Sequence, residues 1–311
     1  MSILKVKDIA FVRFSAPDLE QMRAFLNDFG LASELDDKGD LYAHGSGGSA
    51  FVHSTTKGDP AFLGVGFYAD SVDDLHKLAD AEGVAVEKLT APGGGFVVRL
   101  KDPDGINVEV VAGQQMRQAG EFPSHAGRND ARTKERVREP LRLEDRPAQV
   151  VRLGHAVLEV SDFRASERWY KDLFGFITSD EIEAEPGVAI GAFLRCDRGD
   201  QPTDHHTLFL LQSANAPRLN HAAFEVVDFD DLMCGHAHLK KAERTPAWGV
   251  GRHVLGSQVF DYWRDPWGNE LEHWTDGDLF TAEDGSRTAT LSDLLNVQWG
   301  PLHPMMAGGA K

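Results

Sequence analysis

The sequence predicts an α+β fold in which four βαβββ modules pair into two similar domains. Its 311 residues are enough for about two domains. The second half also repeats the first. KDPDGINVE at 101–109 and RDPWGNELE at 264–272 share the pattern D-P-x-G-x-x-x-E, 163 residues apart. Two further pairs of segments match in the same order, at 69–75 with 226–232 and at 14–31 with 160–176. Three ordered matches indicate two copies of one design.

Each copy divides again into two modules. The first module opens with an alternating apolar strand, predicted at Ile9–Phe14 and at His155–Val160, and continues into an amphipathic helix. That helix is expected to end at Gly30 or Gly175, because glycine accepts the left-handed conformation at a helix terminus. Short strands should follow, at 41–44 and 50–53 in the first half and at 189–195 and 206–211 in the second.

The second module of each half repeats this order. Its first strand is predicted at Leu63–Tyr68 and at His221–Val226, and its helix starts near Val72 or Phe229. The D-P-x-G turn then leads into the last strand. We therefore expect one domain at 1–112, a second at 150–280, a charged linker at 113–149 with room for one short helix, and a tail at 281–311. The helical pattern at 291–297 could cover a pocket or pack on the surface.

Composition narrows the class of protein. The 32 Lys and Arg residues against 49 Asp and Glu give a net charge of −17, which repels phosphate backbones and anionic lipid, so no nucleic-acid or membrane partner is expected. No apolar run approaches the roughly 18 residues of a membrane span and no signal peptide is recognisable, so a cytoplasmic location is expected. Cys196 and Cys234 form no CxxC pair and are expected to be small buried hydrophobes.

Histidine is unusually frequent in the second half. Nine of the 13 histidines lie from His155 onward, and His125 falls in the linker. His155 and His221 open equivalent strands, and Glu272 lies in the final strand. Two imidazoles and one carboxylate suit a divalent metal with open positions, typically Fe(II) or Mn(II). The alternative is that both histidines are hydrogen-bonded core residues.

The repeat provides an internal comparison for this candidate metal site. Aligning the halves sets Ile9 opposite His155, Gly64 opposite His221 and Glu109 opposite Glu272, so only the second half carries the full set. Glu270 competes with Glu272 because strand residues two apart share a face. The repeat favours Glu272, since Glu109 recurs there, whereas Glu270 stands opposite Asn107.

The segment GRHVLGSQVFDYWRDPWGNELE at 251–272 resembles the signature of type I extradiol ring-cleaving dioxygenases, the catechol 2,3-dioxygenase-like enzymes of the vicinal oxygen chelate (glyoxalase/bleomycin resistance) superfamily. In that signature a tyrosine follows a histidine by nine residues, and the ligand glutamate follows the tyrosine by ten, after a D-P-x-G turn. The matching residues are His253, Tyr262, Asp265, Pro266, Gly268 and Glu272. The resemblance extends over 9–278. Asp261 departs from it, because the family usually has an apolar residue there, and this departure bears on the substrate pocket.

The resemblance implies both a site and an activity. His155, His221 and Glu272 would bind Fe(II), with Mn(II) as the alternative. His206 would assist O₂ activation and proton transfer, and His253 and Tyr262 would hydrogen-bond the substrate oxygens. The implied reaction is extradiol (meta) cleavage of a catechol-type or polyhydroxylated aromatic diol in aromatic catabolism, with insertion of both atoms of O₂. A homo-oligomer is implied by the resemblance alone.

Two other functions compete with ring cleavage. Another metalloenzyme of the superfamily, such as a glyoxalase or a thiol-transferring resistance enzyme, would lack the set of His206, His253 and Tyr262. A non-catalytic bleomycin-resistance-like binding protein would need no metal triad at all. The sequence therefore favours the dioxygenase, and metal content would separate the last alternative.

The remaining histidines and the tryptophans are expected to play lesser parts. His205 should face away from His206 toward the outside, because neighbouring strand residues point to opposite sides. His236 and His238 are expected at the surface of a helix. His273 should point away from Glu272 and be structural. Four tryptophans could line the pocket or simply pack beside it, namely Trp248, Trp263, Trp267 and Trp274.

Overall fold

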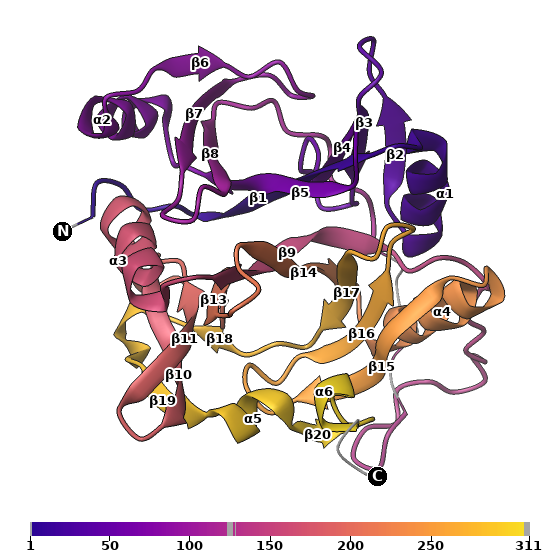
Figure 1. Ribbon diagram of the computed structural model, residues 1–311. Coiled ribbons are helices and arrows are strands. Elements are labelled where there is room, and N and C mark those ends of the chain that lie inside the picture. The colour runs from indigo at the N-terminus through magenta and orange to yellow at the C-terminus, as the bar shows by residue number, and fades with distance from the viewer. Residues whose placement is uncertain (1, 123–126, 128, 308–311) are drawn as a thin grey trace.

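A computed structural model describes residues 2–122, 127 and 129–307, and it contains two large sheets, one in each half of the chain (Figure 1). The first half forms an eight-stranded sheet of order β2-β3-β4-β1-β5-β8-β7-β6. Its elements are β1 (Asp8–Ala16), α1 (Leu19–Phe29), β2 (Ala32–Leu35), β3 (Leu41–His44), β4 (His53–Lys57), β5 (Ala61–Tyr68), α2 (Val72–Glu82), β6 (Val86–Lys88), β7 (Phe96–Lys101) and β8 (Asn107–Ala112).

The second half forms a ten-stranded sheet of order β19-β10-β11-β13-β9-β14-β17-β16-β15-β20. Before the tail, its elements are β9 (Val150–Val160), α3 (Phe163–Phe174), β10 (Ile177–Glu185), β11 (Val188–Arg195), β12 (Thr203–Asp204), β13 (Leu208–Gln212), β14 (Arg218–Val226), α4 (Phe229–Lys241), β15 (Thr245–His253), β16 (Val259–Arg264) and β17 (Glu270–Thr275). The two-residue β12 is an addition to an otherwise regular order. The four predicted βαβββ modules are therefore confirmed.

The tail after β17 joins the second half at several places. It comprises β18 (Leu279–Phe280), a 3₁₀ turn (Ala282–Asp284), β19 (Arg287–Thr290), α5 (Leu291–Leu295), β20 (Val297–Trp299) and α6 (Pro304–Ala307). β19 and β20 extend the ten-stranded sheet at its two edges, and β18 pairs with β12. The tail thus packs along the sheet, and α5 confirms the helical pattern expected at 291–297.

Local sequence explains where the helices begin and end. The side chains of Asp18, Ser71, Asp162 and Asp228 each accept a hydrogen bond from a backbone N–H in the first helical turn. Gly30 and Gly175 adopt left-handed backbone angles (φ 100° and 71°) at the ends of α1 and α3, as predicted.

Two predicted strands are displaced. The strand expected at 50–53 is β4 at His53–Lys57, and the strand expected at 206–211 is β13 at Leu208–Gln212. Ala50, Phe51 and Val52 are buried without belonging to the strand. An apolar run marks burial, whereas the extent of a strand is set by backbone pairing, here with β1.

The register of the central strands corrects one pairing between the halves. Phe11 lies opposite Gly66 in the first half, and His155 lies opposite Ala223 in the second. Gly66 and Ala223 are equivalent because each stands five residues before the N-cap of the following helix. Phe11, not Ile9, is therefore the counterpart of His155. The sequence alignment slipped by two residues because it set Phe14 against Val160, whereas β1 and β9 end at Ala16 and Val160, each two residues before the N-cap of the following helix.

The two halves pack against each other through their central strands, with β1 lying along β9 (Figure 1). His273 on β17 is fully buried in this contact, where its Nε2 lies 2.7 Å from the Phe29 carbonyl oxygen and its ring stacks on Phe29 at 3.8 Å. His273 therefore has the structural role predicted for it. Arg244 and His238 on the second half also pair with Asp28 on α1.

The described residues of 113–149 contain no helix, so the short helix allowed there is not present in that part of the chain. A single β-bridge joins Asn129 and Lys134. His125 lies outside the described residues. Across the portion that the structure describes, no helix is both long and apolar enough to cross a membrane.

Replacing His53 with leucine is expected to stabilise the metal-free protein. The His53 ring is fully buried against Phe14, and neither ring nitrogen has a hydrogen-bond partner. An unpartnered buried polar group costs about 1–3 kcal/mol. The equivalent position of the second half holds Leu208, since His53 lies opposite Val12 as Leu208 lies opposite Ala156. Urea unfolding at pH 7 should show a free energy of unfolding about 1 kcal/mol higher in the variant.

The gain in stability from His53→Leu should also depend on pH. Burial lowers the pKa of His53 to about 3, so between pH 6.5 and 3 the unfolded chain binds a proton that the folded chain does not. Wild-type stability therefore falls as the pH drops through this window, and the gain from His53→Leu should grow to an extra ~2 kcal/mol at pH 5. Exposed His76 on α2, replaced by leucine, is the control. A His53→Leu protein less stable than wild type at both pH values would refute this explanation.

Candidate metal centre and active-site pocket

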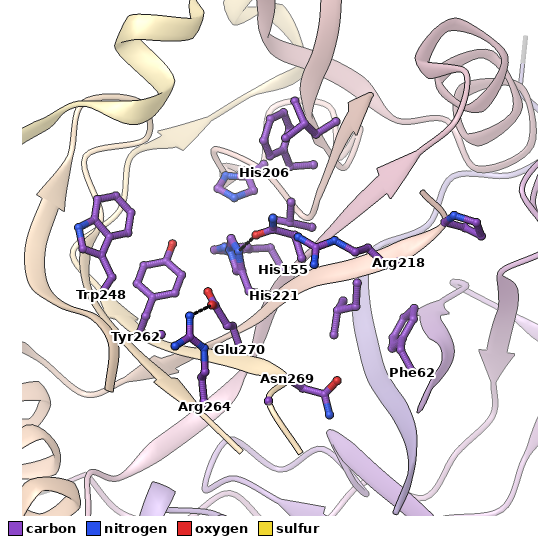
Figure 2. Close-up of a pocket in the computed structure, with 18 of the residues that line it drawn as sticks. Phe62, His155, His206, Arg218, His221, Trp248, Tyr262, Arg264, Asn269 and Glu270 are labelled. Atoms are coloured by element: carbon purple, nitrogen blue, oxygen red, sulfur yellow. Dashed lines mark hydrogen bonds and ion pairs between the residues drawn. The ribbon is translucent and has the colours of Figure 1, made fainter. Parts of the chain in front are cut away.

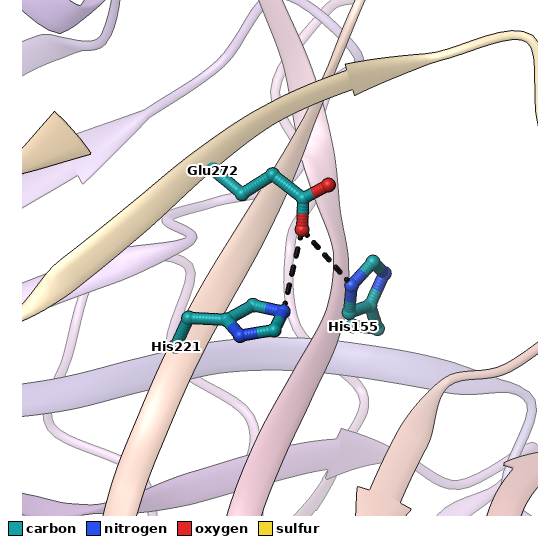
Figure 3. A group of neighbouring side chains, drawn as sticks. All are labelled: His155, His221 and Glu272. Carbon is teal, nitrogen blue, oxygen red and sulfur yellow. Dashed lines mark ion pairs between the residues drawn. The ribbon is translucent and has the colours of Figure 1, made fainter. Parts of the chain in front are cut away.

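Three candidate ligands meet at the centre of the ten-stranded sheet (Figure 3). His155, His221 and Glu272 come from the adjacent strands β9, β14 and β17. Glu272 Oε2 lies 3.4 Å from His155 Nε2 and 3.3 Å from His221 Nε2. Their ligand atoms all lie within 4.8 Å of one another, which is close enough for one ion to bind all three. The structure therefore brings together the three residues that the repeat singled out.

The charge and burial of this triad fit a divalent cation. Glu272 is 0% exposed and His155 is 2% exposed, and neither carboxylate oxygen of Glu272 makes a hydrogen bond. Burial acts to raise the pKa of Glu272, but the surrounding imidazoles of His155, His221 and His253 hold that pKa well below its usual value. Burial lowers the pKa of His155 and keeps it neutral. An ionised carboxylate and a neutral imidazole are the metal-binding forms, and a buried anion without partners needs a cation.

The first half shows how the same fold balances this carboxylate without a metal. Glu109, the counterpart of Glu272, receives Arg13 Nε at 2.7 Å and Arg99 Nε at 2.9 Å. Phe11 replaces His155 and stacks on Phe51, with ring centroids 4.5 Å apart. Two guanidinium groups therefore supply the positive charge in the first half. No arginine or lysine pairs with Glu272, so among the described residues its charge is left for an ion to balance.

The other three predicted site residues surround the triad. The ring centroid of His206, just before β13, lies 4.0 Å from that of His155. Tyr262 on β16 is directly opposite Glu272, and its Oη lies 3.0 Å from His253 Nε2 at the end of β15. Burial and the neighbouring carboxylate raise the pKa of Tyr262 well above its usual value, so its hydroxyl keeps its proton and can donate it to a hydrogen bond.

All these groups except Glu272 are in the lining of one cavity of about 790 Å³ (Figure 2). Its walls also include residues that the sequence did not indicate. Phe62 and Ile106 come from the first half, and Leu294 and His303 come from the tail. The tail is fixed there by Trp248, whose Nε1 donates to the Pro301 carbonyl at 2.9 Å. The tail therefore covers the pocket as well as extending the sheet.

Two of the four tryptophans line the pocket, and the other two pack beside it. Trp248 and Trp267 line the cavity, whereas Trp263 and Trp274 are buried in the protein interior. Both cysteines are free, but only Cys196 is buried as expected, since Cys234 is partly exposed. Aromatic residue type alone did not separate wall from core, because both environments favour large apolar rings.

Two expectations about polar residues are wrong, those for His205 and Asp261. His205 is 1% exposed and contacts Asp180, because the tail rather than solvent covers it in the segment between β12 and β13. The expectation for His236 and His238 holds, since both lie partly exposed on α4 outside the metal triad, and each pairs with an aspartate. Asp261 is fully buried away from the cavity. It lies 3.0 Å from His236 and accepts from Trp263 Nε1, so this departure from the family pattern affects packing under α4 and not the pocket.

A chain ending at Gly300 is expected to bind an aromatic ligand of this cavity more weakly while still binding a metal ion at the triad. The missing segment includes His303, Pro304 and Met305, which line the cavity but do not belong to the triad. Loss of their apolar contacts should cost roughly 1–2 kcal/mol, or about a tenfold rise in KM. Steady-state kinetics and metal analysis on the shortened chain test this, and an unchanged KM would show that the tail takes no part in substrate binding.

Comparison with known proteins agrees with this geometry. Residues 152–273 match the family model of the Glyoxalase/Bleomycin resistance protein/Dioxygenase superfamily. Metapyrocatechase 2 of Cupriavidus necator is 28% identical over 304 residues, covering 95% of this chain and 89% of that protein. The iron-dependent extradiol dioxygenase of Rhodococcus jostii (strain RHA1) is 33% identical over 155 residues, 48% of this chain and 50% of that protein.

A solved structure shares the fold over nearly the whole chain. The Mn(II)-bound glyoxalase from Novosphingobium aromaticivorans has a TM-score of 0.78 and 24% identity, and the match covers 97% of this chain and 93% of that chain. At this level of identity the likeness establishes the shared architecture of paired modules. Residues 152–273 therefore carry the domain of the Glyoxalase/Bleomycin resistance protein/Dioxygenase superfamily, and the chain is similar along nearly its whole length to a metapyrocatechase.

Proposed function

We propose that this protein opens the ring of a catechol-type aromatic diol beside its two hydroxyl groups and inserts both atoms of O₂, with Fe(II) held by His155, His221 and Glu272. The observation that carries the proposal is the unbalanced Glu272 carboxylate. It is buried between two imidazoles beside an apolar cavity, while Glu109 in the same fold is balanced by two arginines. A two-histidine, one-carboxylate set with open positions is typical of non-heme Fe(II) oxygenases.

The names of the relatives support iron and ring cleavage. One relative is a metapyrocatechase and another is an iron-dependent extradiol dioxygenase. Mn(II) is the alternative metal, because a protein of the same fold binds it. When bound, the ion would supply open positions, orientation and charge stabilisation for an aromatic diol and O₂.

The residues around the triad would bind and orient the diol. The Tyr262 hydroxyl, which keeps its proton, can donate a hydrogen bond to a diol oxygen, and His253 contacts that hydroxyl at 3.0 Å. His206 faces the same cavity with a ring nitrogen that can take a proton from the diol. Phe193 and Phe209 stack at 4.0 Å in the cavity wall and would exclude water from the reacting ring.

The proposal is tested by oxygen consumption. Metal-free protein is loaded anaerobically with Fe(II) or Mn(II), and each form is mixed with a panel of catechols in an oxygen electrode while absorbance is recorded. The proposal predicts O₂ uptake and a yellow ring-opened product with the Fe(II) form. If one iron binds per chain and no catechol causes O₂ uptake, ring cleavage is wrong. Turnover of a thiol adduct of an α-ketoaldehyde would then indicate a glyoxalase-like enzyme.

The homo-oligomer that the resemblance implies and the cytoplasmic location both stay predictions. Size-exclusion chromatography with light scattering would measure the first directly.

A further inference from the structure

His206 and two polar side chains behind it, His205 and Asp180, form a buried hydrogen-bonded row that leads away from the cavity. His205 Nδ1 lies 3.1 Å from His206 Nδ1, and His205 Nε2 lies 2.7 Å from Asp180 Oδ2. His205 is 1% exposed and Asp180 on β10 is 8% exposed. The His205 ring is held between Phe193 and Phe280, with centroids at 5.1 and 5.3 Å. These contacts leave His205 little freedom to turn.

The available donors and acceptors determine which atom carries the hydrogen in the His206–His205 contact and in the His205–Asp180 contact. An ionised carboxylate only accepts hydrogen bonds, so His205 Nε2 must carry the hydrogen that Asp180 receives. A neutral imidazole has one N–H, which leaves His205 Nδ1 as an acceptor. His206 Nδ1 must then donate to it. His206 Nε2 is left with a free lone pair, and among the described residues the hydrogen bond of the His206 ring is made by Nδ1.

The first half of the chain lacks this arrangement altogether. The register that sets His53 opposite Val12 and Leu208 opposite Ala156 makes Phe51 the counterpart of His206 and Ala50 the counterpart of His205. The paired polar residues therefore occur only in the half that also carries the metal triad. Because the first half folds with Ala50 and Phe51 at these positions, the fold itself does not require two histidines there.

We propose that Asp180 and His205 are positioning residues that fix the tautomer of His206, so that its unprotonated Nε2 faces the bound diol. This inference rests on the proposed function for its catalytic meaning. The proton leaving one diol hydroxyl bonds to His206 Nε2, and the diol oxygen keeps the electron pair of the broken O–H bond. His205 and Asp180 touch neither substrate nor metal, and they act only through His206. The same logic operates where a carboxylate fixes the tautomer of a catalytic histidine in hydrolytic triads.

Two variants of equal size separate this role from simple packing. His205→Leu removes the acceptor for His206 Nδ1, whereas the isosteric His205→Asn places an amide oxygen near the position of the lost Nδ1. Both variants leave the same cavity and both remove the partner of Asp180. We expect His205→Leu to lower kcat by about 10- to 100-fold with iron content and KM nearly unchanged, a loss bounded by the ~10²–10⁴-fold value of a positioned acid–base group. His205→Asn should stay within about threefold of wild type.

A spectroscopic measurement tests the tautomer without requiring turnover. Full-length protein labelled with ¹⁵N-histidine and loaded with diamagnetic Zn(II) is examined by long-range ¹H–¹⁵N correlation, and His206 is assigned by its absence in His206→Asn. Wild type and His205→Asn should show the Nδ1–H form of His206, and His205→Leu should show a mixture or the Nε2–H form.

The outcomes separate this inference from the proposed function. An Nε2–H form of His206 in wild type would overturn the inference, whether or not any catechol is cleaved. Equal kcat values for His205→Leu and His205→Asn, in protein that does cleave catechols, would also overturn it while leaving ring cleavage intact. If no catechol is cleaved but the tautomers follow the expected pattern, Asp180 and His205 keep their positioning role and the proposed reaction fails.

Discussion

Glu272→Gln is expected to abolish stoichiometric iron binding and, with it, all measurable O₂ consumption. The substitution keeps the size of the side chain but removes the only negative charge among the three candidate ligands. Changes to residues that merely support a metal ligand already cost 10–100-fold in affinity, so the loss of a ligand should exceed about 100-fold. Iron is measured by elemental analysis after anaerobic loading and desalting.

A stability measurement accompanies this prediction. A ligand that binds only the folded state stabilises it by about 2.7 kcal/mol at 100 times its Kd, so Fe(II) should raise the melting temperature of wild type and not that of Glu272→Gln. Glu270→Gln is the matched control, two residues away on the same strand and in the cavity wall. Glu270 pairs with Arg264 and lies outside the triad, so this variant should keep its iron. Iron lost from Glu270→Gln and retained by Glu272→Gln would reverse the ligand assignment.

His206→Asn is expected to keep its iron and to lose about 10²–10⁴-fold in kcat, the usual value of a positioned acid–base group. The His206 ring lies beside the His155 ring but is not one of the three clustered ligands. Burial and the imidazoles of His155 and His205 lower the pKa of His206 well below its usual value, which keeps its ring neutral and able to accept a proton.

The decisive comparison is between turnover and metal content in the same preparation. His76→Asn changes an exposed histidine on α2 and should alter neither quantity. A His206→Asn protein with wild-type kcat would remove His206 from the reaction. One that loses its iron would make His206 part of the metal site instead.

The repeat explains why so much of the site could be predicted from one sequence. Two copies of a module place equivalent residues at equivalent points of a sheet, so His155, His221 and Glu272 stood out against a copy that lacks both histidines. The resemblance carried by the spacing of His253, Tyr262 and Glu272 predicted the rest of the site, and the structure places those residues around one cavity. The same comparison failed in detail at Ile9, because residue similarity aligned Phe14 with Val160, while the backbone pairing that fixes the register is not visible in the sequence.

Features that depend on distant parts of the chain could not be predicted in this way. The alternation rule placed His205 at the outside, but His205 and His206 lie between β12 and β13 rather than in a strand, and nothing in the local sequence indicated that the tail with Phe280 would bury His205. The cavity walls contributed by Phe62 and His303 come from segments far from the triad in sequence. Periodicity indicates which face of a strand is apolar, and it carries no information about which segment later covers that face.

The fate of the two oxygen atoms tests the central claim most directly. Fe(II)-loaded protein is mixed with a catechol under ¹⁸O₂ in ordinary water, the product is reduced at once with borohydride to prevent exchange of its carbonyl oxygen, and its mass is measured. Extradiol cleavage at an iron held by His155, His221 and Glu272 predicts two labelled oxygen atoms in a ring-opened product. A product with one labelled oxygen, or an unlabelled one, would contradict the assignment of this protein as a ring-cleaving dioxygenase.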